Sequence, residues 1–217
     1  LYTCTLDAIK AFDLVSWPAL FFKLINIVPP LLWLVMYNYY LGSSFCIACG
    51  PALSSVAPIS CGVKQGGILS PFLFNFFLND LLDEIEASPF GTWIRSTFTG
   101  MVCYADDILL ISATAHGLQS MITICHHYGL KWKLFFNPSS GKSDVICFNM
   151  PSSFKPPPFY LGSDEITLTT RFTHLGFILD SSDRVLLASH AQSRINSFIG
   201  QAYNLVNRGL SKFHPST

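Results

Sequence analysis

The chain has 217 residues, of which half are hydrophobic and only 12% are charged. This length suits one or two domains, and the apolar content is sufficient for a sizeable core. The formal net charge is zero, which argues against a uniformly basic nucleic-acid-binding surface and confines any such contact to local patches.

The first sixty residues predict a strand, two helices and a pair of strands. Ser16 and Pro18 are typical of a helix start, and the prolines at positions 29 and 30 should end that helix. Gly42 should stop the next one. The expected elements are a strand over 1–6, a helix from 16 to 28, a helix ending at 40, and strands over 45–48 and 53–60.

Further along, Ser70-Pro71 again matches a helix start, and the apolar residues that follow cover a wide helical face. Gly129 should end a later helix, and residues 151–158 form a proline-rich loop. The mixed order of elements favours an α+β fold over a doubly wound sheet. The expected elements are a helix from 70 that ends by 89, a hairpin of 101–105 and 108–112, a helix over 115–128, strands over 130–136, 144–148 and 172–179, and a helix over 185–209.

The apolar stretches are too short or too interrupted to cross a membrane, which requires about 20 nearly uninterrupted apolar residues. The best candidate, residues 31–41, follows two prolines and contains Asn38. We therefore expect no membrane partner, and no signal peptide is visible. Because the first residue is Leu1 rather than methionine and already belongs to an expected strand, we interpret the chain as a fragment of a larger protein.

Seven cysteines, an odd number without a disulfide framework, favour reduced thiols and an intracellular location, in the nucleus, the cytoplasm or both. Cys46 and Cys49 form one CxxC pair, but no second pair follows at zinc-ribbon spacing. We interpret these two residues as half-buried strand cysteines rather than as zinc ligands.

The most informative segment is Tyr104-Ala105-Asp106-Asp107, which separates two apolar runs. The spacing predicts a tight hairpin with the two aspartates at its turn. Adjacent carboxylates at the tip of a buried hairpin repel each other unless a cation offsets their charge, and hard oxygen ligands favour Mg²⁺ or Mn²⁺. On chemistry alone, a solvated acidic turn is an equal alternative.

A second acidic site lies at Asp7, which follows the first expected strand. If that strand lies beside the hairpin, three carboxylates could hold two cations about 3.5–4 Å apart, the spacing used for in-line phosphoryl displacement. Phosphoryl transfer asks a protein mainly for positioning and charge stabilisation. Three acids with few other catalytic groups meet that demand.

Three segments together resemble the central motifs of reverse transcriptases, in the family's order and at similar separations: residues 6–13 (LDAIKAFD), 62–75 (GVKQGGILSPFLFN) and 104–107 (YADD). The second motif most resembles that of non-LTR, LINE-type retrotransposons. YADD alone would be a weak signal, but the combination is highly specific. The resemblance implies a polymerase palm, which is a ferredoxin-like antiparallel sheet with packed helices. Residues 1–180 would form the palm with part of the fingers, and residues 181–217 would begin the thumb.

The resemblance also implies catalytic roles. Asp7 and Asp106 match the main ligands of two Mg²⁺ or Mn²⁺ ions, and Asp107 matches the third catalytic aspartate, whose role is the lesser one. Phe12 matches the aromatic residue that lies beneath the nucleotide sugar. A rigid ring at that place clashes with a 2′-hydroxyl and would thereby select deoxynucleotides.

Further matches concern the loops. Gln65 and Gly66 match the loop that contacts the templating base and the nucleotide, and glycine allows a close backbone approach. Lys142 resembles the lysine of a fourth motif, which gives a proton to the pyrophosphate leaving group or balances its charge. Its spacing from Asn137 is longer than in the usual pattern. His174 lies in a segment that resembles the strand gripping the primer, and we assign it no chemistry.

As an RNA-directed DNA polymerase, the protein would have an RNA template, a DNA primer and deoxynucleoside triphosphates as partners. The family also implies that N-terminal fingers segments, most of the thumb and an endonuclease are missing, so the fragment alone should be inactive or nearly so. Three alternatives stay open. They are an RNA-dependent RNA polymerase-like palm, which Phe12 argues against, a decayed non-catalytic retrotransposon remnant, and a plain α+β domain with acidic turns.

Overall fold

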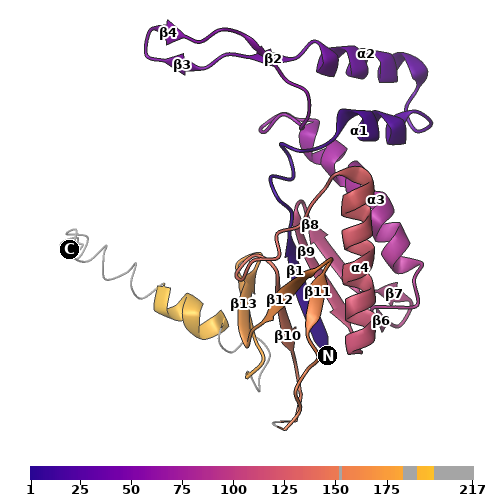
Figure 1. The fold of residues 1–217 in the computed structure, drawn as a ribbon, viewed down its shortest axis with the longest axis vertical. Coiled ribbons are helices and arrows are strands. Elements are labelled where there is room, and N and C mark those ends of the chain that lie inside the picture. The colour runs from indigo at the N-terminus through magenta and orange to yellow at the C-terminus, as the bar shows by residue number, and fades with distance from the viewer. Residues whose placement is uncertain (152, 183–189, 198–217) are drawn as a thin grey trace, which may run out of the picture.

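Residues 1–151, 153–182 and 190–197 are described by the computed structural model. Its centre is a six-stranded sheet in the order β11-β12-β10-β1-β9-β8, with β1 (Tyr2–Asp7) in the interior (Figure 1). Neighbouring strands are antiparallel except for β10 and β12. The remaining strands of this sheet are β8 (Met101–Tyr104), β9 (Asp107–Ser112), β10 (Asp144–Cys147), β11 (Phe159–Leu161) and β12 (Asp164–Leu168).

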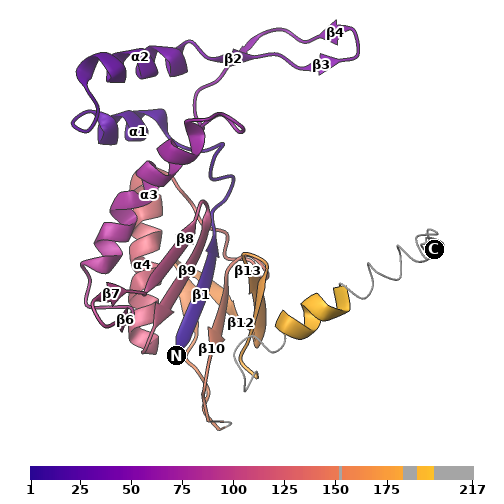
Figure 2. The same ribbon diagram turned by 180° about the vertical axis from the view of Figure 1, so that it is seen from behind.

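One face of the sheet is covered by two long helices, α3 (Ser70–Glu86) and α4 (Ala115–Trp132), which lie side by side in both views (Figures 1 and 2). Successive strand residues point to opposite faces, so Cys4 and Leu6 of β1 turn toward the helices and are buried with Phe74. Each large apolar side chain buried there contributes roughly 1.5–3 kcal/mol. The alternate residues of β1 therefore face the other side of the sheet.

That other face is partly covered by a small hairpin, β13 (Arg171–His174) and β14 (Phe177–Asp180). Phe172 of the hairpin packs there with Leu109 and Ile146 of the sheet. The strands of the sheet are thus covered by helices on one side and by a two-stranded layer on the other.

A third part of the molecule extends away from the sheet at the end where β1 stops (Figure 1). It begins with α1 (Trp17–Leu24), whose Lys23 is fastened to the helical layer. The Lys23 Nζ lies 2.5 Å from Asp80 Oδ1 and 2.7 Å from the hydroxyl of Tyr128. The part continues with α2 (Pro30–Leu41) and an arm in which β2 (Ser44–Phe45) pairs with β5 (Ala57–Pro58) and β3 (Ala48–Cys49) pairs with β4 (Ala52–Leu53).

The end of α4 differs from the expectation. The helix continues through Gly129 to Trp132 and ends at Lys133, whose φ of 61° turns the chain back over Gly129. A Cβ atom at Gly129 would lie 2.5 Å from the carbonyl oxygen of Leu134. The strand expected over 130–136 is therefore wrong, and its C-terminal end makes only a single β-bridge from Phe136.

Other strand predictions are wrong where turns interrupt a β-type sequence. The strand expected over 172–179 is the β13–β14 hairpin, whose turn at Leu175 and Gly176 has φ angles of 50° and 78°. In the arm, the long expected strands are two-residue pairs, and Cys46 and Cys49 are exposed rather than half-buried. The β11–β12 pair and a short hairpin of β6 (Trp93–Ile94) and β7 (Thr97–Phe98) were not anticipated.

The C-terminal helix expected over 185–209 lies largely outside the described residues, and its described part, 190–197, is helical. The start of a thumb expected over 181–217 lies mostly outside them as well. None of the helices that the structure describes combines the length and the apolarity needed to cross a bilayer.

Candidate active site

Asp7 and Asp107 lie directly opposite each other, Asp7 at the end of β1 and Asp107 at the start of β9. The Cα atoms of such antiparallel pairs are about 4.5–5.5 Å apart, and their side chains share one face of the sheet. Since Cys4 and Leu6 occupy the helix-covered face, Asp7 turns to the opposite one. Two carboxylates are therefore held side by side on the face away from the helices.

The hairpin tip is shifted by one residue from the expectation that both aspartates form the turn. The turn residues are Ala105 and Asp106, whereas Asp107 is already a strand residue paired with Tyr104. Ala105 adopts a left-handed backbone, with φ of 54°, as the tight turns of two-residue hairpins require. The strand residue beside Asp7 is consequently Asp107, and Asp106 lies next to it in the turn.

A cavity of about 450 Å³ opens over the two carboxylates, between the sheet and β13. We call it the aspartate cavity. The sheet and the loop before β10 supply one side of it, and β13 supplies the other. Its ionisable side chains are Asp7, Asp107, Lys142, Asp144, Arg171 and His174.

Lys142 enters the aspartate cavity in spite of its long spacing from Asn137. Its Nζ lies 3.4 Å from Asp7 Oδ1, and the lysine side chain is 53% exposed. The loop is tied at both ends, because the backbone N–H of Asn137 donates to the Asp7 carbonyl (2.9 Å) and the buried Asp144 carboxylate accepts from the Gly141 N–H (3.0 Å). An ion pair that is this exposed adds little stability. Because its side chain is accessible, the lysine can contact a ligand.

His174 lies in the aspartate cavity although the sequence analysis assigned it no chemistry. It is 9% exposed, and its Nε2 is buried without a hydrogen-bond partner among the described residues. Burial lowers the pKa of His174, and the nearby Asp107 partly offsets that effect. The available sequence signal was its place in the segment that resembles the primer-gripping strand, but nothing in the sequence showed that β13 folds over the aspartates.

The donor chemistry of this face fits a divalent cation. Asp7 and Asp107 offer the hard oxygen ligands that Mg²⁺ and Mn²⁺ prefer, and like charges directly opposite each other destabilise a sheet. In the part of the chain that the structure describes, Lys142 is the only cation within 4 Å of either carboxylate. The same part contains no group of three His, Cys, Asp or Glu side chains placed to hold a metal, so the carboxylates that the structure brings together here are those of Asp7 and Asp107.

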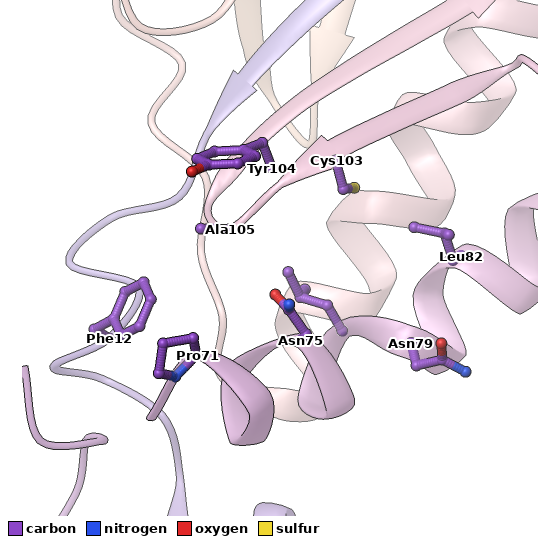
Figure 3. Close-up of a pocket in the computed structure, with 9 residues that line it drawn as sticks. Phe12, Pro71, Asn75, Asn79, Leu82, Cys103, Tyr104 and Ala105 are labelled. Atoms are coloured by element: carbon purple, nitrogen blue, oxygen red, sulfur yellow. The ribbon is translucent and has the colours of Figure 1, made fainter. Parts of the chain in front are cut away.

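Phe12 lies on the loop after β1, and its ring stacks on Phe74 of α3 with centroids 4.6 Å apart and 18° between the planes. The residue is half-buried and lines a second cavity, of about 480 Å³, between α3 and the edge strand β8 (Figure 3). We call it the edge cavity. Phe12 thus borders an open space near the hairpin tip, as a residue in contact with a nucleotide would.

Gln65 and Gly66 lie on a loop that is bound to the segment after β1. The Val63 N–H donates to the Phe12 carbonyl (2.7 Å), and Gln65 Nε2 donates to Asp13 Oδ1 (2.9 Å). Gly66 has φ of 76°, a conformation that favours glycine. Gln65 also borders a hollow of about 740 Å³ beside the end of α2. The loop is therefore fixed relative to the strand that carries Asp7.

The family model of reverse transcriptases (RNA-dependent DNA polymerases) matches residues 1–179. This range contains every candidate site residue from the sequence. The chain is also 27% identical over 202 residues to the RNA-directed DNA polymerase from mobile element jockey of Drosophila funebris, covering 90% of this chain and 21% of that protein.

A probable RNA-directed DNA polymerase from transposon X-element of Drosophila melanogaster is 25% identical over 205 residues, covering 93% of this chain and 22% of that protein. The retrovirus-related Pol polyprotein from retrotransposable element R2DM of the same species is 29% identical over 85% of this chain and 18% of its own length. The chain thus spans about a fifth of the curated relatives that it matches. The expected resemblance to non-LTR retrotransposon polymerases is confirmed.

Among solved structures, apo telomerase from Candida tropicalis, truncated from the C-terminal domain, superposes with a TM-score of 0.56, covering 84% of this chain and 34% of that one. The sequence identity is 12%, so this likeness concerns the fold alone. It supports the mixed arrangement of helices and a sheet that the sequence predicted.

Proposed function

Since the chain belongs to the reverse transcriptase family, we propose that it forms the palm and part of the fingers of an RNA-directed DNA polymerase. The polymerase extends the 3′-hydroxyl of a DNA primer with deoxynucleotides along an RNA template. The chain covers about a fifth of its relatives, so this activity belongs to a polypeptide with further fingers, thumb and endonuclease segments. The 217 residues alone are inactive or nearly so.

The pairing of Asp7 with Asp107 is the observation that carries this proposal. It joins the first and third motifs on one face of the sheet, where the aspartate cavity gives access to a ligand. Asp106 follows Ala105 in the adjoining turn, and in this proposal it joins the pair when the ions bind. A plain acidic turn would not require the end of a second strand to present another carboxylate directly opposite.

In the proposed reaction, Asp7 and Asp107, joined by Asp106, would hold two Mg²⁺ or Mn²⁺ ions. When bound, such ions offset the charge of the triphosphate and lower the pKa of the attacking hydroxyl. Lys142 balances the charge of the departing pyrophosphate or gives it a proton, which its place 3.4 Å from Asp7 supports.

Phe12 and the Gln65-Gly66 loop position the nucleotide. The Phe12 ring is held by its stack on Phe74, so it cannot turn aside easily, and a 2′-hydroxyl would meet it. Gln65 and Gly66 approach the templating base and the nucleotide from a loop that is bound to the same segment. The strand and the loop therefore hold the nucleotide between them.

Primer extension tests the proposal in a polypeptide that carries this chain with its natural flanking segments. With an RNA template, Mg²⁺ and deoxynucleotides, the unchanged protein should extend the primer and Asp106→Ala should abolish extension. Glu86→Ala is the control, because Glu86 is an exposed carboxylate at the far end of α3.

Other outcomes of the assay would support one of the alternative functions. A preference for ribonucleotides would support an RNA polymerase-like palm. No extension by a folded protein would support a decayed retrotransposon remnant. A primer formed by the nicked end of a DNA duplex, which we propose as the natural substrate, should be extended in the same assay.

A further inference from the structure

The proline-rich loop before β11 has no part in the proposed polymerase reaction. Residues 153–158 belong to a loop that projects beyond the end of the sheet in both views (Figures 1 and 2). The loop leads directly into β11 through residues 155–160 (KPPPFY). Pro157 and Pro158 are exposed, so the loop presents proline rings to solvent rather than to the core.

The backbone of this segment is stiff. Proline fixes its own φ at about −65°, and a residue that precedes proline is restricted to extended conformations. Positions 156–158 are prolines, and positions 155–157 each precede one, which favours the polyproline II conformation over 155–158. The structure places these four residues in neither a helix nor a strand. A partner that binds them would therefore lose little affinity to the ordering of the chain.

Tyr160 presents its side chain directly after the prolines. Its neighbours in β11, Phe159 and Leu161, are buried in the main core, so Tyr160 turns to the opposite face and is 41% exposed. Its N–H donates to Gln119 Oε1 of α4 (2.8 Å), and Gln119 Nε2 donates to its carbonyl (2.9 Å). The hydroxyl makes no hydrogen bond to another described residue. The backbone of Tyr160 is thus fixed while its side chain is accessible.

Two exposed prolines followed two residues later by an exposed tyrosine suit a partner with an aromatic-lined groove. SH3 and WW domains bind proline-rich segments in such grooves. An SH3 domain needs two prolines three positions apart, and the prolines at 151, 156, 157 and 158 contain no such pair. A WW-type groove that takes two adjacent prolines, with a neighbouring pocket for a tyrosine, fits positions 157, 158 and 160. The buried position 159 needs no contact with the partner.

We propose that residues 157–160 (PPFY) are a docking site for a protein that carries a WW-type domain. The site is separate from the catalytic aspartates and does not depend on the proposed function. Phe159 packs against Tyr2 with ring centroids 6.2 Å apart. Tyr2 and Asp7 are the two ends of β1, roughly 17 Å apart at the usual rise of a strand. A partner bound at this site would therefore leave the aspartate cavity open.

The test measures binding of a purified WW domain, of the kind that binds Pro-Pro-x-Tyr, to the polypeptide with its flanking segments. Fluorescence anisotropy of the labelled domain gives a dissociation constant and requires no turnover. The unchanged protein should bind this domain and should not bind a purified SH3 domain at the same concentrations. Tyr160→Phe, which removes only the hydroxyl, should weaken WW binding about threefold to tenfold, as expected for one neutral hydrogen bond.

Two more variants complete the design. Pro157→Ala combined with Pro158→Ala should weaken binding further than Tyr160→Phe, because both ring contacts and the stiffness of the backbone are lost. Phe154→Ala is the matched control, since Phe154 is an aromatic residue of the same loop, 42% exposed and outside the motif. It should bind the WW domain as the unchanged protein does. Urea unfolding checks that each variant is folded, and if the proline variant is not, Tyr160→Phe decides alone.

The outcomes are distinct. Failure of the unchanged protein to bind the WW domain would overturn the inference. Equal affinity of the unchanged protein and the folded proline variant, or of the unchanged protein and Tyr160→Phe, would show that the domain contacts another surface and would overturn it as well. Tighter binding of the SH3 domain than of the WW domain would overturn the choice of partner.

Discussion

Asp7 and Asp107 meet across two strands with a single lysine beside them, an arrangement that disfavours folding in the absence of cations. Opposed like charges on a sheet cost roughly 0.2–1 kcal/mol. A cation bound only by the folded protein reverses that effect. The residues that would bind the metal are therefore expected to lower the stability of the metal-free protein while being needed for its activity.

Replacing Asp107 by Asn, a side chain of nearly the same size, tests whether this carboxylate lowers stability without metal and is needed for activity. In EDTA, the variant should gain about 0.2–1 kcal/mol in free energy of unfolding while losing primer extension. Mg²⁺ should raise the unfolding midpoint of the unchanged protein more than that of the variant. Urea unfolding with and without Mg²⁺ measures both effects.

Asp164→Asn is the matched control for that experiment, because Asp164 is a strand aspartate that pairs with Leu161 rather than with another acid. It should show neither a gain in EDTA nor a changed response to Mg²⁺. A metal-free Asp107→Asn protein less stable than the unchanged one would contradict the repulsion between the opposed carboxylates.

His174 should make stability depend on pH. Because its pKa in the folded protein lies below the ordinary 6.5, the unfolded chain binds more protons between the two pKa values. Stability from this residue is thus full above about pH 6.5 and is lost as the pH falls toward the folded pKa. The charged groups that share its cavity are Asp7, Asp107, Lys142, Asp144 and Arg171.

His174→Gln should therefore lose less stability than the unchanged protein between about pH 7.5 and about pH 5.5. Urea unfolding at both pH values measures the difference. His127→Gln, at an exposed histidine of α4, should respond to acid as the unchanged protein does. An unaltered acid response in His174→Gln would show that this imidazole is not kept neutral by burial.

Elements were predictable where local signals decide the structure. The apolar strand before Asp7, the Ser70-Pro71 helix start and the two-residue hairpin are each encoded within a few residues. The first two form as expected, and the hairpin forms with its turn one residue earlier than expected. The helix end was predicted too early, because Gly129 lies inside the last turn of α4 and leaves room for the chain as it turns back at Leu134. The turn at Leu175 was missed because a leucine with positive φ carries no sequence signal.

For the candidate site, too, local features were predictable from the sequence and contacts between elements were not. The motifs placed Asp7 beside the hairpin, but the choice between Asp106 and Asp107 depends on the register of the β8–β9 turn, which the sequence leaves undecided. The exposure of Lys142 to the aspartate cavity depends on the loop held by Asp144. Contacts between residues of different elements could therefore not be predicted from the sequence.

The junction of α1 with α3 and α4 depends on Lys23. Its ammonium lies 2.5 Å from Asp80 Oδ1 and within 4.2–4.8 Å of three ring centroids, those of Phe77, Tyr128 and Trp132. Burial lowers the pKa of Lys23, and Asp80 partly offsets that shift. A side chain only 8% exposed that binds both helices is expected to fix how α1 sits on them.

Lys23→Met should lower the free energy of unfolding by about 1–3 kcal/mol, because Tyr128 and the Phe77 carbonyl lose a buried partner. Urea unfolding measures the loss. Lys131→Met is the control, since Lys131 is exposed and stacks on Trp132 alone. Equal effects of the two substitutions would contradict a special role for the buried lysine.

At the scale of the whole molecule, apolar surface and charge are unevenly placed. The chain is neutral overall, while α2 presents a group of exposed apolar side chains at the outer edge of the fold (Figure 1). These are Leu31, Leu32, Leu34, Val35 and Leu41. Contiguous exposed apolar surface favours association, and the low charge of the chain does little to oppose it.

The 217-residue chain on its own should therefore self-associate with increasing concentration, as light scattering after gel filtration would show. Leu31→Glu combined with Val35→Lys should reduce that association, since the new pair stands four residues apart and can form a favourable helical ion pair. Leu168→Lys, at an exposed leucine of β12, adds a charge away from α2 and should leave association unchanged. If all three proteins associate equally, another surface holds the copies together. If only the α2 variant stays monomeric, the apolar side of α2 is the contact.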